Sequence, residues 1–178
     1  MKFLPRRSGP SALERGFTLR ELLIVMVIVA IISAIAVART GNDPVLLSTQ
    51  AEQLAGDIRY VQSLAMTQAA ATSAQARYRI NFVSASTYTF TRADGTAVPH
   101  PLTGSTAPIA LSSGVTITLP PTNLGSSLLG FDGRGIPYTD AAVSVPLAVG
   151  ATASIRLNKG ADSRTVTVTS QTGLVRVP

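Results

Sequence analysis

The amino-acid sequence predicts an α+β fold, in which a long N-terminal helix packs on a C-terminal antiparallel β-sheet domain. Three patterns predict it. Residues 22–38 are apolar except for Ser33, residues 47–65 carry apolar side chains at spacings of three and four, and the residues after 71 form short runs of period two rich in Thr, Val and Tyr. The 178 residues provide one modest domain plus an additional segment.

Composition limits the possible functions. Hydrophobic residues make up 46% of the chain and charged residues only 13%, so part of the apolar surface should contact lipid or partner helices. Cysteine is absent, which excludes disulfides and thiolate metal sites. The net charge is +6, but residues 1–16 contain four bases and one acid, so the remainder carries only +3 and gives little support for nucleic-acid binding.

The N-terminal 38 residues have the pattern of a leader followed by a membrane helix. Residues 1–16 are basic and are interrupted by Pro5, Gly9 and Pro10, so we expect a leader peptide. The apolar run at 22–38 would span about 25 Å as a helix, at the short end of the transmembrane range. We therefore predict a transmembrane and assembly helix over 17–39, with basic residues before it placing the N-terminus in the cytoplasm.

The segment from Gly16 to Val25 reads Gly-Phe-Thr-Leu-Arg-Glu-Leu-Leu-Ile-Val and resembles the cleavage and assembly motif of type IV pilins and type II secretion pseudopilins. The resemblance implies that a prepilin peptidase cuts after Gly16 and methylates the new N-terminus at Phe17. It also implies a single-pass protein of the bacterial inner membrane with a periplasmic C-terminal domain, which then enters a filament. The implied partners are other pilins or pseudopilins, the peptidase, inner-membrane lipid and the inner-membrane assembly platform.

Glu21 can be interpreted from its chemistry alone. A carboxylate at the edge of a hydrocarbon span is costly unless it is paired or functional. Cleavage after Gly16 would create an ammonium on Phe17, and a neighbouring subunit displaced along the helix axis would bring that amine to Glu21. The alternative is that Glu21 lies unpaired in the headgroup layer beside Arg20.

A second helical segment is predicted over 40–72, as a continuation of the first. Asp43 suits an N-cap and Pro44 the first helical position. The apolar stripe of this segment consists of Leu47, Ala51, Leu54, Ile58, Val61 and Ala65. We expect the stripe to cover the protein's own sheet rather than a filament core. The polar residues expected largely elsewhere on the helix are Glu52, Gln53, Asp57, Arg59 and Gln62.

Residues 73–178 are predicted to form the periplasmic β-rich domain. Alternation at 78–82 and 87–91 indicates an antiparallel hairpin connected through 84–86. Further strands are expected at residues 115–119, 128–131, 143–149, 153–157, 165–169 and 174–177. Pro146 should lie at an edge or bulge. Residues 97–114 contain three prolines and little periodicity, which predicts an exposed loop.

Within the pilin-like proteins, three features resemble the GspH/FimT branch of minor pilins and pseudopilins. They are the helix over 50–68, the Phe-Asp-Gly-Arg-Gly turn at 131–135 and the closing Gly-Leu-Val-Arg-Val at 173–177. The resemblance implies a structural subunit of a type II secretion pseudopilus or a type IV pilus. A membrane-anchored periplasmic domain unrelated to filaments is an alternative.

The sequence offers little for catalysis or cofactor binding, so we expect no enzyme, no cofactor and no metal. The single histidine, His100, stands between two prolines and is expected to be exposed. Asp132 and Asp140 are too few to fill a calcium shell and are expected in turns. The segment Gly133-Arg134-Gly135 lacks the rest of a phosphate-binding fingerprint and is expected to be a β-turn.

DNA binding, as by a minor pilin in natural transformation, is the other alternative. Some FimT-like proteins are thought to bind DNA through a C-terminal Gly-Arg-x-Arg pattern, and this chain has Gly-Leu-Val-Arg at 173–176 instead. The candidate phosphate contacts are Arg77, Arg79, Arg156, Arg164 and Arg176. The competing interpretation is that these charges face solvent and protect sheet edges.

Overall fold

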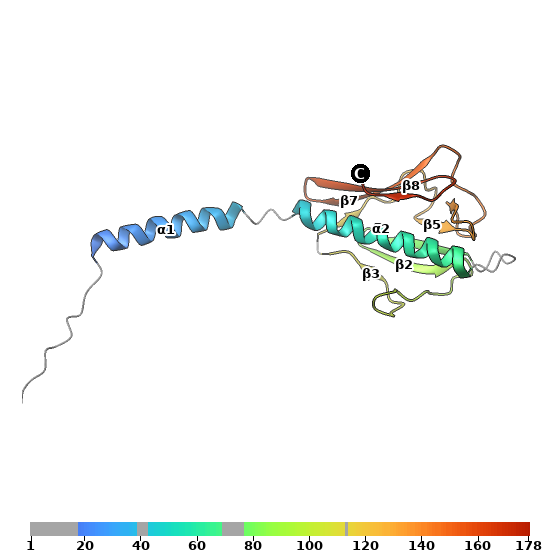
Figure 1. The fold of residues 1–178 in the computed structure, drawn as a ribbon, viewed down its shortest axis with the longest axis horizontal. Helices are drawn as coiled ribbons and strands as arrows, with labels where there is room; N and C mark the ends of the chain where they lie inside the picture. The colour runs from blue at the N-terminus through green and yellow to red at the C-terminus, as the bar shows by residue number, and fades with distance from the viewer. Residues whose placement is uncertain (1–17, 39–42, 69–76, 113) are drawn as a thin grey trace, which may run out of the picture. The chain divides into compact units, whose positions relative to one another are not determined.

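The structure is a computed structural model, and it describes residues 18–38, 43–68, 77–112 and 114–178 (Figure 1). The chain divides into two compact units, Met1–Gly41 and Asn42–Pro178. The described part of the first unit contains helix α1 (Leu19–Ala38), and the second unit begins with helix α2 (Asp43–Gln68). Antiparallel strands follow α2, so the predicted α+β class is confirmed.

The strands of the second unit form two antiparallel sheets, a division that the sequence did not predict. The five-stranded sheet has the order β3 (Ile109–Ala110), β2 (Thr87–Arg92), β1 (Tyr78–Ser84), β5 (Leu128–Phe131) and β6 (Pro137–Tyr138). The four-stranded sheet has the order β4 (Thr116–Ile117), β7 (Thr152–Lys159), β8 (Asp162–Thr169) and β9 (Val175–Arg176).

Both long hairpins agree with the period-two patterns. In the first, β1 pairs with β2 with Ile80 opposite Phe90, and the chain turns at residues 85–86 as predicted. In the second, Ile155 of β7 lies opposite Val166 of β8, and both are fully buried. The alternation in the sequence therefore correctly indicates which face of each strand is buried.

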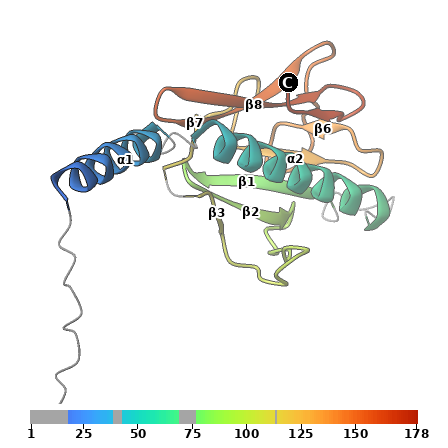
Figure 2. The same cartoon turned by 60° about the vertical axis from the view of Figure 1, so that its left-hand side comes forward.

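Helix α2 joins the two sheets. It contacts β1 and β5 of the five-stranded sheet and β7, β8 and β9 of the four-stranded sheet (Figure 2). The contacts come from the predicted apolar stripe, whose members are each no more than 1% exposed: Leu47, Ala51, Leu54, Ile58, Val61 and Ala65. The stripe therefore covers the protein's own sheets, as expected. The expectation that Asp57 lies away from the packed face was wrong, because Asp57 is only 6% exposed.

The predicted strand at 143–149 is also wrong. The Asp140 carboxylate accepts hydrogen bonds from the backbone N–H groups of Ser144 and Val145, both at 2.7 Å, and turns the chain there. Val143 then adopts a φ of 52° and is fully buried against Gly130. Pro146 pairs with Tyr138 beside the edge strand β6, in agreement with its predicted edge position.

The predicted exposed loop at 97–114 is partly ordered and partly buried. It contains the short strand β3, and the side chains of Val98, His100 and Leu111 are buried. Strand β6 was also not predicted, and β4 and β9 are shorter than expected. Two-residue strands provide too little alternation for a period to be seen in the sequence.

Candidate functional site

The start of α1 is fixed by Thr18. Its side-chain Oγ1 accepts a hydrogen bond from the Glu21 backbone N–H at 3.3 Å, and its carbonyl oxygen accepts from the backbone N–H groups of Glu21 and Leu22 at 3.0 and 3.1 Å. A Thr followed three residues later by Glu is the pattern of a capping box. That spacing in the sequence would have identified Thr18 as the N-cap, which the sequence interpretation missed. The predicted cleavage residues Gly16 and Phe17 lie outside the described residues.

Glu21 lies in the first turn of α1 with its side chain exposed. A carboxylate at this position is stabilised by the exposed N–H groups of the helix N-terminus. No ion pair involves Glu21 in the described part of the chain. The carboxylate is therefore accessible to a cation that another molecule supplies.

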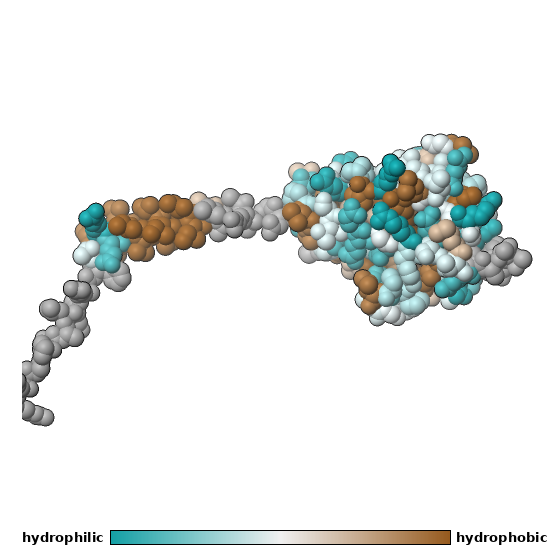
Figure 3. Space-filling model, in the orientation of Figure 1, coloured by the Kyte–Doolittle hydropathy of each residue, from teal (hydrophilic) through white to brown (hydrophobic). Residues whose placement is uncertain are grey.

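Helix α1 presents apolar side chains around its whole circumference. The large hydrophobic residues from Leu22 to Ile32 are all about half exposed or more, and the helix forms a continuous apolar surface (Figure 3). A helix that is apolar on all sides normally lies inside a large core or a membrane. Within the residues that the structure describes, no helix has both the length and the apolarity required to cross a membrane.

The three segments that resemble the GspH/FimT branch meet at Gln62 of α2. The Gln62 side-chain amide donates hydrogen bonds to the carbonyl oxygens of Gly135 at 3.0 Å and of Thr172, the residue just before the segment at 173–177, at 3.2 Å. One turn earlier, the Arg59 guanidinium donates to the carbonyl oxygen of Val175 at 3.0 Å. Polar groups of the helix thus bind both the turn at 131–135 and the C-terminal segment.

Gly173 is required at this junction for two reasons. Its φ is +61°, a backbone conformation that residues with a Cβ rarely adopt. A Cβ at this position would lie 2.3 Å from the carbonyl oxygen of Gly135 and 2.4 Å from Nε2 of Gln62. At Gly173 the backbone of the C-terminal segment therefore packs directly against the Gly135 carbonyl oxygen and the Gln62 side-chain amide.

The turn at 131–135 is stabilised by Asp132, as predicted. Asp132 Oδ1 accepts from the backbone N–H groups of Arg134 and Ile136, both at 2.9 Å, and the Gly135 N–H donates to the Asp132 carbonyl oxygen at 2.9 Å. The segment is a β-turn, and Asp140 likewise caps a turn. Over the described ranges, no cluster of three or more His, Cys, Asp or Glu residues is placed to hold a metal ion.

A buried polar cluster joins α2 to the segment after β2. Tyr88 donates a hydrogen bond to Asp57 Oδ2 at 2.5 Å, and His100 Nε2 lies 3.3 Å from Asp57 Oδ1. Burial raises the pKa of the Asp57 carboxyl, while Tyr88 and His100 act in the opposite direction. Burial and the neighbouring carboxylate raise the pKa of Tyr88.

The position of His100 corrects the expectation of an exposed histidine, since only 6% of the residue is accessible. Its ring stacks on Phe90 with a centroid separation of 5.8 Å, and its Nδ1 accepts a hydrogen bond from the Leu102 N–H at 3.2 Å. Tyr60 also donates to the Pro99 carbonyl oxygen at 3.3 Å. The histidine therefore helps to hold the segment around 97–105 against the helix.

The five candidate phosphate-binding arginines lie on separate surfaces. Arg77 and Arg79 donate hydrogen bonds to the carbonyl oxygens of Val143 and Ala141 on the five-stranded sheet. On the four-stranded sheet, strand alternation puts Arg156 and Arg176 on the solvent face and Arg164 on the opposite face, where it is exposed near the start of β8. Because a phosphate-binding stripe needs its cations on one face, this placement gives DNA binding little support.

One comparison with known proteins found a match. A family model described as the prokaryotic N-terminal methylation motif matches residues 12–37, which include Gly16, Phe17 and Glu21 and most of α1. The match supports a type IV prepilin-like protein, whose motif belongs to structural subunits. No curated protein and no solved structure matched the chain.

Proposed function

We propose that the protein is a structural subunit of a type IV pilus or a type II secretion pseudopilus, cleaved after Gly16 and methylated at Phe17. The observation that supports this most is the coincidence of the matched motif with a helix that has Glu21 in its first turn and exposed large apolar side chains from Leu22 to Ile32. Other pilins or pseudopilins, the prepilin peptidase and an inner-membrane assembly platform are the proposed partners.

We further propose that residues 17–39 anchor the protein in the bacterial inner membrane as a single pass, with the N-terminus in the cytoplasm and the β domain in the periplasm. The exposed apolar surface of α1 supports this, because lipid or partner helices would remove that surface from water. The basic residues before the helix support the orientation.

The proposed assembly chemistry uses the two charges at the start of the helix. Cleavage after Gly16 converts a peptide nitrogen into the terminal amine of Phe17, which is a cation. The exposed Glu21 carboxylate of a neighbouring subunit pairs with that amine, and the attraction is strong where water is excluded. An uncleaved chain has no amine at Phe17, so assembly requires cleavage.

The β domain supports a minor subunit of the GspH/FimT branch. The three segments that carry that resemblance converge at Gln62 and are not scattered over the domain. Convergence at one junction is expected if these segments form a common framework of the branch, and it would be a coincidence if they were unrelated loops.

Two variants of the full chain test the proposed function. Gly16→Ala should leave the leader attached, because the peptidase no longer recognises the cleavage bond, and Glu21→Val should yield a cleaved, membrane-held protein that fails to enter filaments. Glu52→Val is the matched control, since Glu52 is also an exposed acid but lies in α2. Processing is measured by immunoblot mobility and N-terminal sequencing, and assembly by recovery in sheared filaments or co-purification with neighbouring subunits.

The outcomes separate the two parts of the proposal. If the assembled protein begins at Met1, the prepilin assignment is wrong. If Glu21→Val assembles as well as Glu52→Val, the protein is processed as proposed but the charge-pairing step is wrong.

A further inference from the structure

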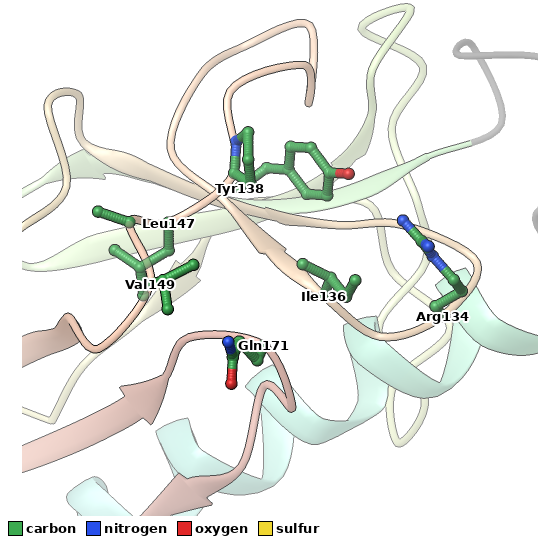
Figure 4. Close-up of a pocket in the computed structure, with 8 residues that line it drawn as sticks. Arg134, Ile136, Tyr138, Leu147, Val149 and Gln171 are labelled. Atoms are coloured by element: carbon green, nitrogen blue, oxygen red, sulfur yellow. The ribbon is translucent and has the colours of Figure 1, made fainter.

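A cleft of about 390 Å³ lies beside the edge strand β6 (Figure 4). One wall is formed by Ile136 and Tyr138, and the other by residues 146–149, which follow the turn at Asp140. Gln171, in the turn between β8 and β9, and Arg134 complete the lining. The volume is at the low end of the range for ligand sites and suits one or two side chains of a partner.

The walls of the cleft are held in place by contacts behind them. Val143 packs so closely on Gly130 that a Cβ there would lie 2.6 Å from Val143 Cγ2. Arg77 and Arg79 donate hydrogen bonds to the carbonyl oxygens of Val143 and Ala141, and the Leu147 N–H donates to the Pro137 carbonyl oxygen at 2.9 Å. A partner would therefore meet a preformed wall and lose little free energy in ordering it.

The lining is mainly apolar, and part of it is left in water. Leu147 is buried at the base, whereas the Val149 side chain beside it is 80% exposed. Pro146 and Ala148 are exposed as well. An apolar group placed here would remove both itself and Val149 from water, which is the usual source of affinity at such a site.

The polar part of the lining defines the charge of the partner. Among the described residues that line the cleft, Arg134 is the single charged one. Its side chain is 76% exposed, and its Nε and Nη2 both donate hydrogen bonds to Asp132 Oδ2 at 3.3 Å. None of the described residues that line the cleft is acidic. Gln171 adopts a φ of +65° in its turn, and its side-chain amide makes no hydrogen bond to any other described residue. A partner that complements this lining has an apolar group next to a carboxylate.

We infer that this cleft docks a segment of another protein in which an apolar side chain is adjacent to an Asp or Glu. The apolar side chain lies between Ile136 and Val149, and the carboxylate binds the Arg134 guanidinium, which suits two parallel hydrogen bonds. The inference concerns the β domain alone and does not depend on cleavage after Gly16 or on pairing at Glu21.

The test uses the full chain in the cells that produce it, with the photoreactive residue p-benzoylphenylalanine in place of Val149. We expect a crosslink to one protein, and sequencing of the linked peptide should find an apolar residue within two positions of an acid. The same replacement at Leu102, which is 86% exposed and does not line the cleft, is the control for nonspecific capture.

Charge reversal tests the role of Arg134. Arg134→Glu should reduce the crosslink about tenfold, the loss expected for an arginine that anchors an interface, whereas Arg156→Glu, at an exposed arginine of the other sheet, should leave it unchanged. Replacing the partner's acid by Arg should restore the crosslink to Arg134→Glu, which separates loss of binding from loss of folding.

Several results would overturn the inference. They are a yield at Val149 no higher than at Leu102, a crosslink to lipid or to a second copy of this chain, a linked peptide without an acid, and a crosslink that persists in Arg134→Glu. Each can occur whether or not the chain is cleaved and assembled, so this test is independent of the test of the proposed function.

Discussion

Helices α1 and α2 are comparable in length, with 20 and 26 residues, but they use apolar side chains in opposite ways. In α2 the apolar residues form one stripe that is buried against two sheets, and the opposite face is polar. In α1 the apolar residues surround the helix, and those from Leu22 to Ile32 are all exposed. The arrangement of apolar residues therefore decides whether a helix builds its own domain or requires surroundings supplied from outside.

The two helices also differ in how they place an acid. Glu21 lies exposed in the first turn of α1, where the helix N-terminus stabilises it and no described cation pairs with it. Asp57 lies in the interior of α2, buried between Tyr88 and His100. One acid is accessible to another molecule, and the other is fully committed within the domain.

The largest expected effect distinguishes the buried apolar residues of α2 from the exposed apolar residues of α1. Ile58→Ala in α2 should lower the free energy of unfolding of the β domain by about 2–5 kcal/mol, because it leaves a cavity in a fully buried position. Ile28→Ala in α1 should change it by less than about 0.5 kcal/mol, because that side chain is about half exposed. Chemical denaturation of the full chain in detergent micelles measures both.

Near-ultraviolet circular dichroism is a suitable signal for that comparison. The chain has no tryptophan, and its four tyrosines all lie in the second unit: Tyr60, Tyr78, Tyr88 and Tyr138. The tyrosine signal therefore reports unfolding of the β domain and not of α1. Equal losses for Ile28→Ala and Ile58→Ala would show that α1 contributes to the stability of the β domain, contrary to the comparison.

A second prediction concerns the polar contacts of α2. Gly173→Ala should destabilise the β domain by about 2–4 kcal/mol, because the new Cβ collides with the Gly135 carbonyl oxygen and the φ of +61° is strained. Gly95→Ala is the matched control: its φ is +89°, but its Cβ would meet no atom within 4 Å. It should cost only the strain, about 1 kcal/mol. Equal costs would mean that the contacts at Gln62 can shift to admit the new Cβ without any loss of stability.

The parts of this fold that depend on neighbouring residues could be predicted from the sequence. The stripe of α2, the β1–β2 hairpin and the alternation of β7 and β8 each follow from a period within one segment. The same holds for the start of α1, where the Thr18-x-x-Glu21 spacing is local and was available in the sequence. Periodicity reports which face of a segment is apolar, and that is sufficient for these elements.

The parts that depend on distant residues could not be predicted. Asp57 is buried because Tyr88 and His100 approach it from strand β2 and the segment after it, and no spacing along the chain announces that contact. Residues 143–149 alternate like a strand, but Asp140 turns the chain and Val143 fills the space above Gly130. The convergence at Gln62 likewise joins residues 73 and 110 positions apart.

The smallest predicted effect sharpens the comparison of the two acids. Burial raises the pKa of Asp57 above its ordinary value of 3.8, so between 3.8 and that raised pKa the folded protein holds a proton that the unfolded chain has lost. The free energy of unfolding should therefore fall as the pH rises through this window, by at most about 1.4 kcal/mol per pH unit, and become constant above it. Asp57→Asn cannot ionise and should remove this slope.

Asp94→Asn is the control with the opposite sign. Hydrogen bonds from Thr96 lower the pKa of the exposed Asp94 carboxyl, so its contribution is present above pH 3.8 and is lost as the pH falls through its folded pKa. Removing Asp94 should thus leave the slope due to Asp57 in place. A slope that survives in Asp57→Asn would show that another group binds the proton and that the buried acid of α2 remains ionised throughout.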